Sequence, residues 1–169
     1  MLRPALSILI LLAACRTTVP ILVDADPIQR EALFGPVRAL EGTWSVETPE
    51  GPAEVRFQLS SRGSVVRELM FPGTEHEMTN MYSLDGNSLV MTHYCAGGNQ
   101  PRMRATELAG KRMAFESVGV SDLEESEDHY MGAMTLVLVD ADHVEQHWTS
   151  FATATGERGG VVFRLTRVR

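Results

Sequence analysis

The sequence predicts an all-β domain, a closed up-and-down antiparallel barrel of about 8–10 strands with a short N-terminal helix before the first strand. Turn-forming glycines recur after residue 40 at a spacing that suits one strand plus one tight turn. The segments between them alternate apolar and polar residues, as in Val55, Phe57 and Leu59. A long run of sequence-adjacent strands leaves two open edges unless the sheet closes on itself. The glycines are Gly51, Gly63, Gly73, Gly86, Gly97 and Gly110.

Residues 1–14 are typical of a signal peptide. Arg3 precedes an apolar run, Ala5 to Ala14, that is too short to span a bilayer. The run ends in Leu12-Ala13-Ala14-Cys15, which resembles a bacterial lipobox. That resemblance implies lipidation at Cys15 and an extracytoplasmic, membrane-anchored protein. It also implies the outer membrane in a Gram-negative cell, because Arg16 follows the cysteine. The alternative is an ordinary cleavable signal in which Cys15 is incidental.

Three further segments follow the signal. Residues 15–26 lack any hydrophobic period and are expected to form a lipidated tether. Residues 27–39 are expected to form a short helix and lead-in, with Asp26 as N-cap and Gly35-Pro36 as its stop. Residues 40–169 then make the barrel.

Composition excludes some classes of function. The formal net charge of -7 leaves no excess of cations to bind phosphates, so no nucleic-acid partner is expected. If Cys15 is lipidated, Cys95 is the only remaining thiol and no intrachain disulfide forms.

The hairpin around Asp85-Gly86 supplies the most detailed geometric prediction. A two-residue loop at Asp85-Gly86 pairs Tyr82 with Leu89, Asn80 with Met91, Met78 with His93 and His76 with Cys95. This face is expected inside the barrel, because the opposite face carries Glu77, Thr79, Ser83, Thr92 and Tyr94. Methionines after the initiator all lie between Met70 and Met134, which is consistent with an adaptable pocket wall.

A candidate ligand pocket follows from this face and its neighbours. Arg102 or Arg104 is a candidate anchor for a ligand carboxylate, although exposure on an edge is the alternative. Three interpretations stay open: a packed core, a pocket for a small apolar ligand without metal, and a soft-metal or haem site using His, Cys and Met. A cofactor is predicted only under the soft-metal or haem interpretation. The pocket residues are Met70, His76, Met78, Asn80, Tyr82, Met91, His93, Cys95, Arg102 and Met103.

Other candidate groups favour a solvated surface. His143, Glu145 and His147 share one side of a strand, but Trp148 favours the other side as the interior. Glu124, Glu125, Glu127 and Asp128 are expected in a loop at the barrel mouth. No oxyanion-hole, nucleophile-elbow or phosphate-loop motif accompanies Cys95 and its histidines, so the protein is not expected to be an enzyme.

The segment Gly42-x-Trp44 resembles the opening of the calycin superfamily, which includes lipocalins and fatty-acid-binding proteins. The segment Met91 to Met103 also resembles a stretch of bacterial lipocalin-like secreted proteins. The resemblance implies that Trp44 plugs one barrel end and that a basic residue of the last strand packs over it. Arg167 is the candidate, because strand alternation places it on the same side of the last strand as Phe163 and Leu165.

Together these observations predict a function. The expected protein is a membrane-anchored, extracytoplasmic, non-catalytic lipocalin-like barrel that binds a small apolar or amphipathic ligand. One alternative is a haem or soft-metal barrel that uses the 76–95 hairpin. The second is an envelope structural or interaction module with no small ligand.

Overall fold

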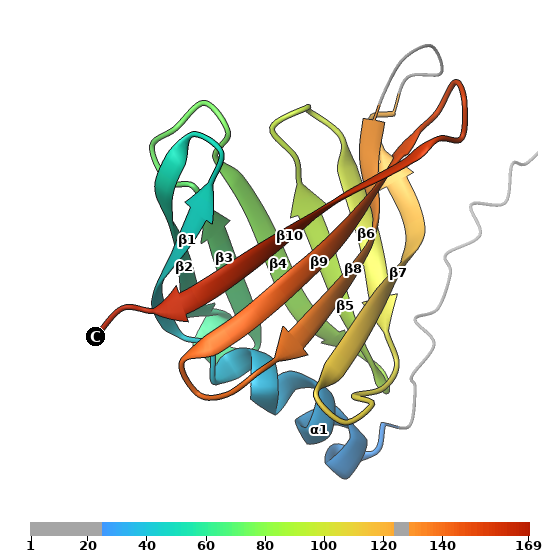
Figure 1. Cartoon of the computed structure of the whole chain (residues 1–169). Helices are drawn as coiled ribbons and strands as arrows, with labels where there is room; N and C mark the ends of the chain where they lie inside the picture. Colours follow the sequence, from blue (N-terminus) through green and yellow to red (C-terminus); the bar gives the residue numbers. More distant parts are fainter. Residues whose placement is uncertain (1–24, 124–128) are drawn as a thin grey trace, which may run out of the picture.

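A computed structural model describes residues 25–123 and 129–169 (Figure 1). The predicted lipidation site Cys15 and the predicted acidic loop at 124–128 lie outside these residues. One α-helix, α1, precedes ten strands and a short 3-10 turn, η1, in the described part of the chain. The elements are α1 Pro27–Arg38, β1 Gly42–Thr48, β2 Gly51–Ser60, η1 Ser61–Gly63, β3 Val65–Met70, β4 Met78–Asp85, β5 Ser88–Tyr94, β6 Gln100–Ala105, β7 Arg112–Ser121, β8 His129–Leu138, β9 His143–Ala152 and β10 Arg158–Arg167.

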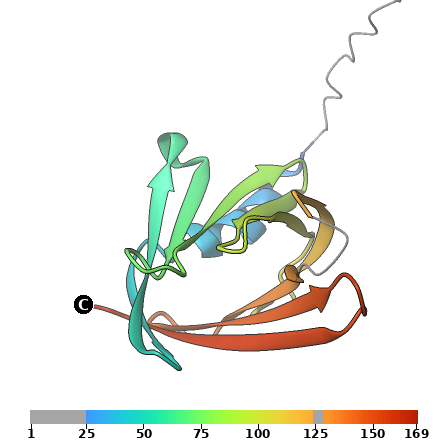
Figure 2. The same cartoon turned by 90° about the horizontal axis from the view of Figure 1, so that it is seen from above.

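The strands form a closed antiparallel barrel, as predicted. Each strand pairs with its chain neighbours, and β1 pairs with β10 to close the ring (Figure 2). The β1–β2, β3–β4, β5–β6 and β9–β10 connections gather at one end, the mouth, and α1 lies across the other end (Figure 1). The barrel therefore has one end covered by a helix and one end framed by loops.

Helix α1 begins as the sequence predicts but ends later. The Asp26 carboxylate accepts a hydrogen bond from the Ile28 backbone N–H at 2.9 Å, which caps the first turn. The helix continues through Pro36 to Arg38, so the prediction that Gly35-Pro36 stops it is wrong. Buried Val37 packs into the core, and the Ala39 N–H bonds to the Gly35 carbonyl, so helical hydrogen bonding continues past Pro36, which has no N–H to donate. No helix in the described residues is long and apolar enough to cross a membrane.

Trp44 and Arg167 close the covered end in the way that the calycin resemblance implies. Trp44 is 0% exposed, and its indole N–H donates to the Leu40 carbonyl at 2.8 Å. The Arg167 guanidinium lies 4.2 Å from the centroid of the Trp44 ring, a cation–π contact. The same guanidinium donates to the Glu41 carbonyl at 2.9 Å. Arg167 thus ties the last strand to the segment that joins α1 to β1.

Steric constraints explain why glycine occupies position 42 in the Gly42-x-Trp44 segment. Gly42 has a φ of +132°, in the region that side chains avoid. A Cβ placed there lies 3.1 Å from Nη1 of Arg167. Glycine at this position therefore leaves room for the guanidinium that covers Trp44.

The β4–β5 hairpin has the predicted faces but a different register. Asp85 pairs with Ser88, so the loop is Gly86-Asn87 rather than Asp85-Gly86. Gly86 has a φ of 59° while Asn87 has no positive φ, which fits a type II′ turn and not the type I′ turn expected from Asp-Gly. Helix α1 holds this turn, because the Asn87 side chain accepts from the Asp26 N–H at 2.7 Å.

The corrected register changes the cross-strand partners. Asn80 pairs with His93 and Tyr82 with Met91, so the predicted pairing of Met78 with His93 is wrong. His76 and Cys95 both lie in mouth loops outside the ladder, so they are not paired either. The slip is two residues, and side chains alternate with a period of two. The inward-facing set is therefore retained.

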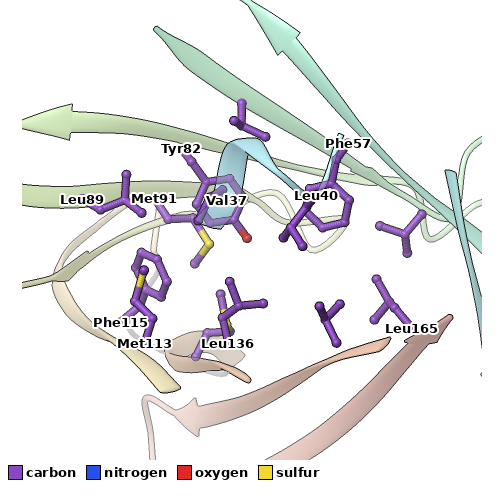
Figure 3. Close-up of a cluster of buried hydrophobic side chains, with 14 of the residues drawn as sticks. Val37, Leu40, Phe57, Tyr82, Leu89, Met91, Met113, Phe115, Leu136 and Leu165 are labelled. Atoms are coloured by element: carbon purple, nitrogen blue, oxygen red, sulfur yellow. The ribbon is translucent and has the colours of Figure 1, made fainter. Parts of the chain in front are cut away.

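The hydrophobic core fills the covered half of the barrel. Figure 3 shows side chains from the strands and α1 that point toward one another there. Met91 and Met103 are fully buried in this core and directly paired across β5 and β6. Labelled members are Val37, Leu40, Phe57, Tyr82, Leu89, Met91, Met113, Phe115, Leu136 and Leu165.

Candidate functional site

A buried polar network crosses the barrel interior on the mouth side of this core. It centres on Glu68 of β3, which is 0% exposed. The Glu68 carboxylate accepts hydrogen bonds from the Asn80 amide at 2.7 Å, the Tyr82 hydroxyl at 2.7 Å and the Gln146 amide at 2.6 Å. Asn80 and Tyr82 come from neighbouring β4, whereas Gln146 comes from β9. The network therefore joins opposite walls of the barrel.

His93 extends the network by one side chain. Its Nδ1 lies 2.6 Å from Oδ1 of Asn80. Because the Asn80 amide nitrogen donates to Glu68, its oxygen is the acceptor here, which assigns the proton of neutral His93 to Nδ1. His93 Nε2 is buried and has no hydrogen-bond partner. The ring centroid lies 4.9 Å from that of Trp148.

Burial determines the protonation of these groups. Desolvation lowers the pKa of His93 to about 4, so the imidazole is neutral at pH 7. Desolvation also raises the pKa of Glu68, while the hydrogen bonds from Asn80, Tyr82 and Gln146 lower it in part. Burial, followed by the neighbouring Glu68 charge, raises the pKa of Tyr82 well above its ordinary value. Tyr82 is therefore a neutral donor to Glu68.

A cavity of about 480 Å³ opens at the mouth, next to the network. Two of its wall residues on β10, Val161 and Phe163, are the direct cross-strand partners of Trp148 and Gln146. On the other side, cavity residue Met78 is paired with Met70, whose sulfur lies 3.4 Å from the Asn80 amide nitrogen. The cavity lining is Thr48, Pro49, Glu50, Gly51, Pro52, Ala53, Phe71, Thr74, Glu75, His76, Met78, Ala96, Val161 and Phe163.

The cavity lies where two strands separate. β1 and β10 pair only from Trp44 to Val46 against Arg167 to Leu165, near the covered end. Closer to the mouth, β1 pairs only with β2 and β10 pairs only with β9. Residues of both separated stretches, Thr48 of β1 and Phe163 of β10, line the cavity.

The charged residues of the lining are acidic. They are Glu50 and Glu75, and His76 lies beside Glu75. Among the described residues, the lining contains neither Lys nor Arg. Apolar contacts dominate the walls, including an edge-to-face pair between Phe71 and Phe163 with centroids 5.4 Å apart. The cavity thus combines apolar walls with a rim of negative charge.

The predicted pocket residues fall into five places, the last of which is the outer face that carries Arg102. Asn80, Tyr82 and His93 belong to the network, which Met70 contacts, and His76 and Met78 line the cavity. Met91 and Met103 are core residues away from the cavity. Cys95 is half-buried in the β5–β6 loop, where its sulfur accepts from the Gly97 N–H at 3.4 Å.

Arg102 lies outside the barrel, which corrects its placement in the pocket. Its side chain is 54% exposed, and its guanidinium lies 3.8 Å from the Asp85 carboxylate. Arg104, the other candidate anchor, is also on the outer face and pairs with Asp85 at 2.6 Å. The neighbouring Met103 takes the inward position, and alternation then directs Arg102 and Arg104 outward.

The sequence reasoning missed the role of Glu68, although its signal was present. Val66, Glu68 and Met70 lie on the same side of β3, and the two apolar residues, Val66 and Met70, are buried. An acidic residue on an apolar stripe indicates a buried polar site. Gln146 lies on the same side of β9 as buried Trp148, but its contact with Glu68 spans 78 residues of sequence and has no local signature.

The outer face of β9 is solvated, as predicted. His147 lies 2.6 Å from Glu145, and His143 lies 2.8 Å from Asp140, all at the surface. Nowhere in residues 25–123 and 129–169 do three or more His, Cys, Asp or Glu side chains gather closely enough to hold a metal ion. The soft-metal alternative also loses the predicted His76–Cys95 pair.

The ten-stranded barrel and preceding helix fit a calycin-like fold. No protein-family model matches the chain, and no curated protein matches its sequence. Its function is therefore argued from the site.

Proposed function

We propose that this protein is a non-catalytic binding barrel that takes a small amphipathic molecule into its mouth. The observation that carries the proposal is the cavity of about 480 Å³ with apolar walls, whose residue Phe163 is the cross-strand partner of Gln146 in the buried polar network. Ligand pockets are typically concave, largely apolar and supplied with a few convergent polar groups. A ligand here would place its apolar part against Phe71, Met78 and Phe163.

The cavity favours ligand binding over a purely structural or interaction module. A packed core leaves few voids larger than a water molecule. The mouth instead keeps a cavity within the range of small-molecule sites, about 300–1,000 Å³. The wall residues Val161 and Phe163 lie on a stretch of β10 that pairs only with β9.

Filling the cavity is expected to abolish binding. In Met78→Trp the larger side chain occupies the cavity, and the affinity for N-phenyl-1-naphthylamine, an uncharged fluorescent probe, should fall about tenfold or more. Fluorescence titration measures this. The matched control is Met81→Trp on the outward side of the same strand, which should leave the affinity unchanged. Equal probe binding by wild type and Met78→Trp would contradict the proposal.

We also propose that a lipid on Cys15 anchors the protein to a bacterial membrane, on the strength of the lipobox-like segment alone. In Cys15→Ser the sulfur that would carry the lipid is absent. Metabolic labelling with a clickable fatty acid, together with membrane fractionation, should show loss of both label and anchorage. Cys95→Ser is the control and should keep both. A labelled, membrane-bound Cys15→Ser protein would refute the anchor.

A further inference from the structure

The hydrogen bonds of the buried network leave acceptors free. Each donor atom already has an acceptor: the Asn80 and Gln146 amides and the Tyr82 hydroxyl donate to Glu68. The Trp148 indole donates to Gln146 at 3.3 Å, and His93 Nδ1–H donates to Asn80. Gln146 uses one of its two amide N–H groups in this network. The lone pair of His93 Nε2 and a fourth position on the Glu68 carboxylate are free to accept. These two acceptors favour a head group that donates.

The electrostatics of the site point in the same direction. No ion pair among the described residues includes Glu68, although seven arginine–carboxylate pairs occur elsewhere in the described chain. Three side-chain donors converge on the Glu68 carboxyl group, which matches its ionised form. A buried carboxylate without a cation is costly, and a cationic ligand relieves that cost. The charged residues of the cavity lining, Glu50 and Glu75, add negative potential along the path to it.

Flexible side chains separate the cavity from the network. Met70 and Met78 are directly paired between the two, and the Met70 sulfur contacts the Asn80 amide. Methionine side chains are unbranched and repack readily around different shapes. A head group in the cavity reaches the network when these two side chains move apart.

We infer that the ligand is a cationic amphiphile, whose protonated amine donates to His93 Nε2 and the Glu68 carboxylate while its apolar body fills the mouth cavity. This inference rests on the proposed function and specifies its ligand class. It reverses the charge expected from an arginine anchor, because Arg102 and Arg104 lie outside and Glu68 lies inside. A fatty-acid carboxylate would be repelled by the Glu68 carboxylate.

Three probes with the same alkyl chain test the inference on the wild-type protein: decylamine, decanol and decanoate, by isothermal titration calorimetry at pH 7. We expect decylammonium to bind about tenfold more tightly than decanol, since hydrogen bonds to charged groups are the stronger ones. Decanoate should bind most weakly. Equal affinities for the amine and the alcohol, or tighter binding of decanoate, would overturn the inference.

Two variants test whether Glu68 causes the tighter binding of decylamine than of decanol. Glu68→Gln keeps the size of the side chain and removes its charge, so the amine should lose its advantage while decanol binds as before. Glu145→Gln, on the outer face beside Arg164, is the matched control and should keep the advantage. An unchanged preference in Glu68→Gln would overturn the assignment to Glu68. If Glu68→Gln does not fold, the wild-type series still decides.

The two proposals fail in different ways. If the uncharged probe N-phenyl-1-naphthylamine binds in the cavity and decylamine shows no advantage over decanol, the cationic ligand class is wrong and the binding barrel stands. If neither the uncharged probe nor any decyl compound binds, the binding function itself is wrong, and the inference falls with it.

Discussion

Replacing Trp44 with alanine is expected to lower the free energy of unfolding by about 3–5 kcal/mol, the usual cost of truncating a buried aromatic side chain. Trp44 is fully buried, packs edge-to-face on Phe57 with centroids 6.2 Å apart, and lies under the Arg167 guanidinium. The truncation leaves a cavity at the covered end and also removes the indole donor to the Leu40 carbonyl. Urea unfolding followed by far-UV circular dichroism measures the change without relying on tryptophan fluorescence.

The control for this experiment is Tyr94→Ala. Tyr94 is also a strand aromatic residue, but it is 49% exposed on the outer face of β5. Its truncation should change stability far less, since little apolar area is removed from a buried site. A Trp44→Ala effect no larger than that of Tyr94→Ala would mean that Trp44 does not hold the covered end together.

The fold was predictable because the sequence features that specify it, turn glycines and alternating strand residues, are local and periodic. Turn glycines mark the strand ends, and Gly51, Gly63, Gly73, Gly86 and Gly110 all have positive φ. Alternation assigns each side chain to a face, and a register slip of two residues preserves that assignment. This is why Asn80, Tyr82 and His93 were correctly expected inside even though their cross-strand partners were not.

The site was only partly predictable, for a physical reason. Alternation alone identifies His93 as inward and Arg102 as outward, since Met103 faces the interior. The error at Arg102 came from expecting a carboxylate anchor instead of following that alternation. The partners of Glu68 could not be inferred in the same way, because closure of the barrel brings Gln146 across from a distant strand. The alternation within a strand predicts which face of the sheet a residue occupies. Contacts across the barrel interior depend instead on how the sheet closes into a barrel.

Acid is expected to destabilise the protein through His93. Burial lowers the pKa of His93 from 6.5 to about 4, so between these values the unfolded chain binds more protons than the folded protein. The stability contributed by neutral His93 is fully present above pH 6.5 and is lost as the pH falls toward 4. The shift corresponds to about 3 kcal/mol at 1.36 kcal/mol per unit of pKa.

Glu68 changes the stability with pH in the opposite direction to His93. The pH dependence of wild-type stability alone therefore does not isolate the contribution of His93. Burial raises the pKa of Glu68 above 4.5, and its contribution therefore falls as the pH rises from 4.5 through the raised value. Comparison with His93→Gln, which retains Glu68 and does not titrate at this position, removes that contribution. We expect the stability advantage of wild type over His93→Gln to shrink by about 3 kcal/mol between pH 7 and pH 4.

Urea unfolding of both proteins at several pH values in this range measures the difference. The control is His76→Gln, because the His76 side chain is 63% exposed in the β3–β4 loop. Its stability curve should run parallel to that of the wild type. If the His93→Gln curve is also parallel, then His93 is not a buried neutral imidazole, and its free Nε2 acceptor is not available to a ligand. A converging curve, in contrast, identifies the neutral ring that the proposed ammonium would meet.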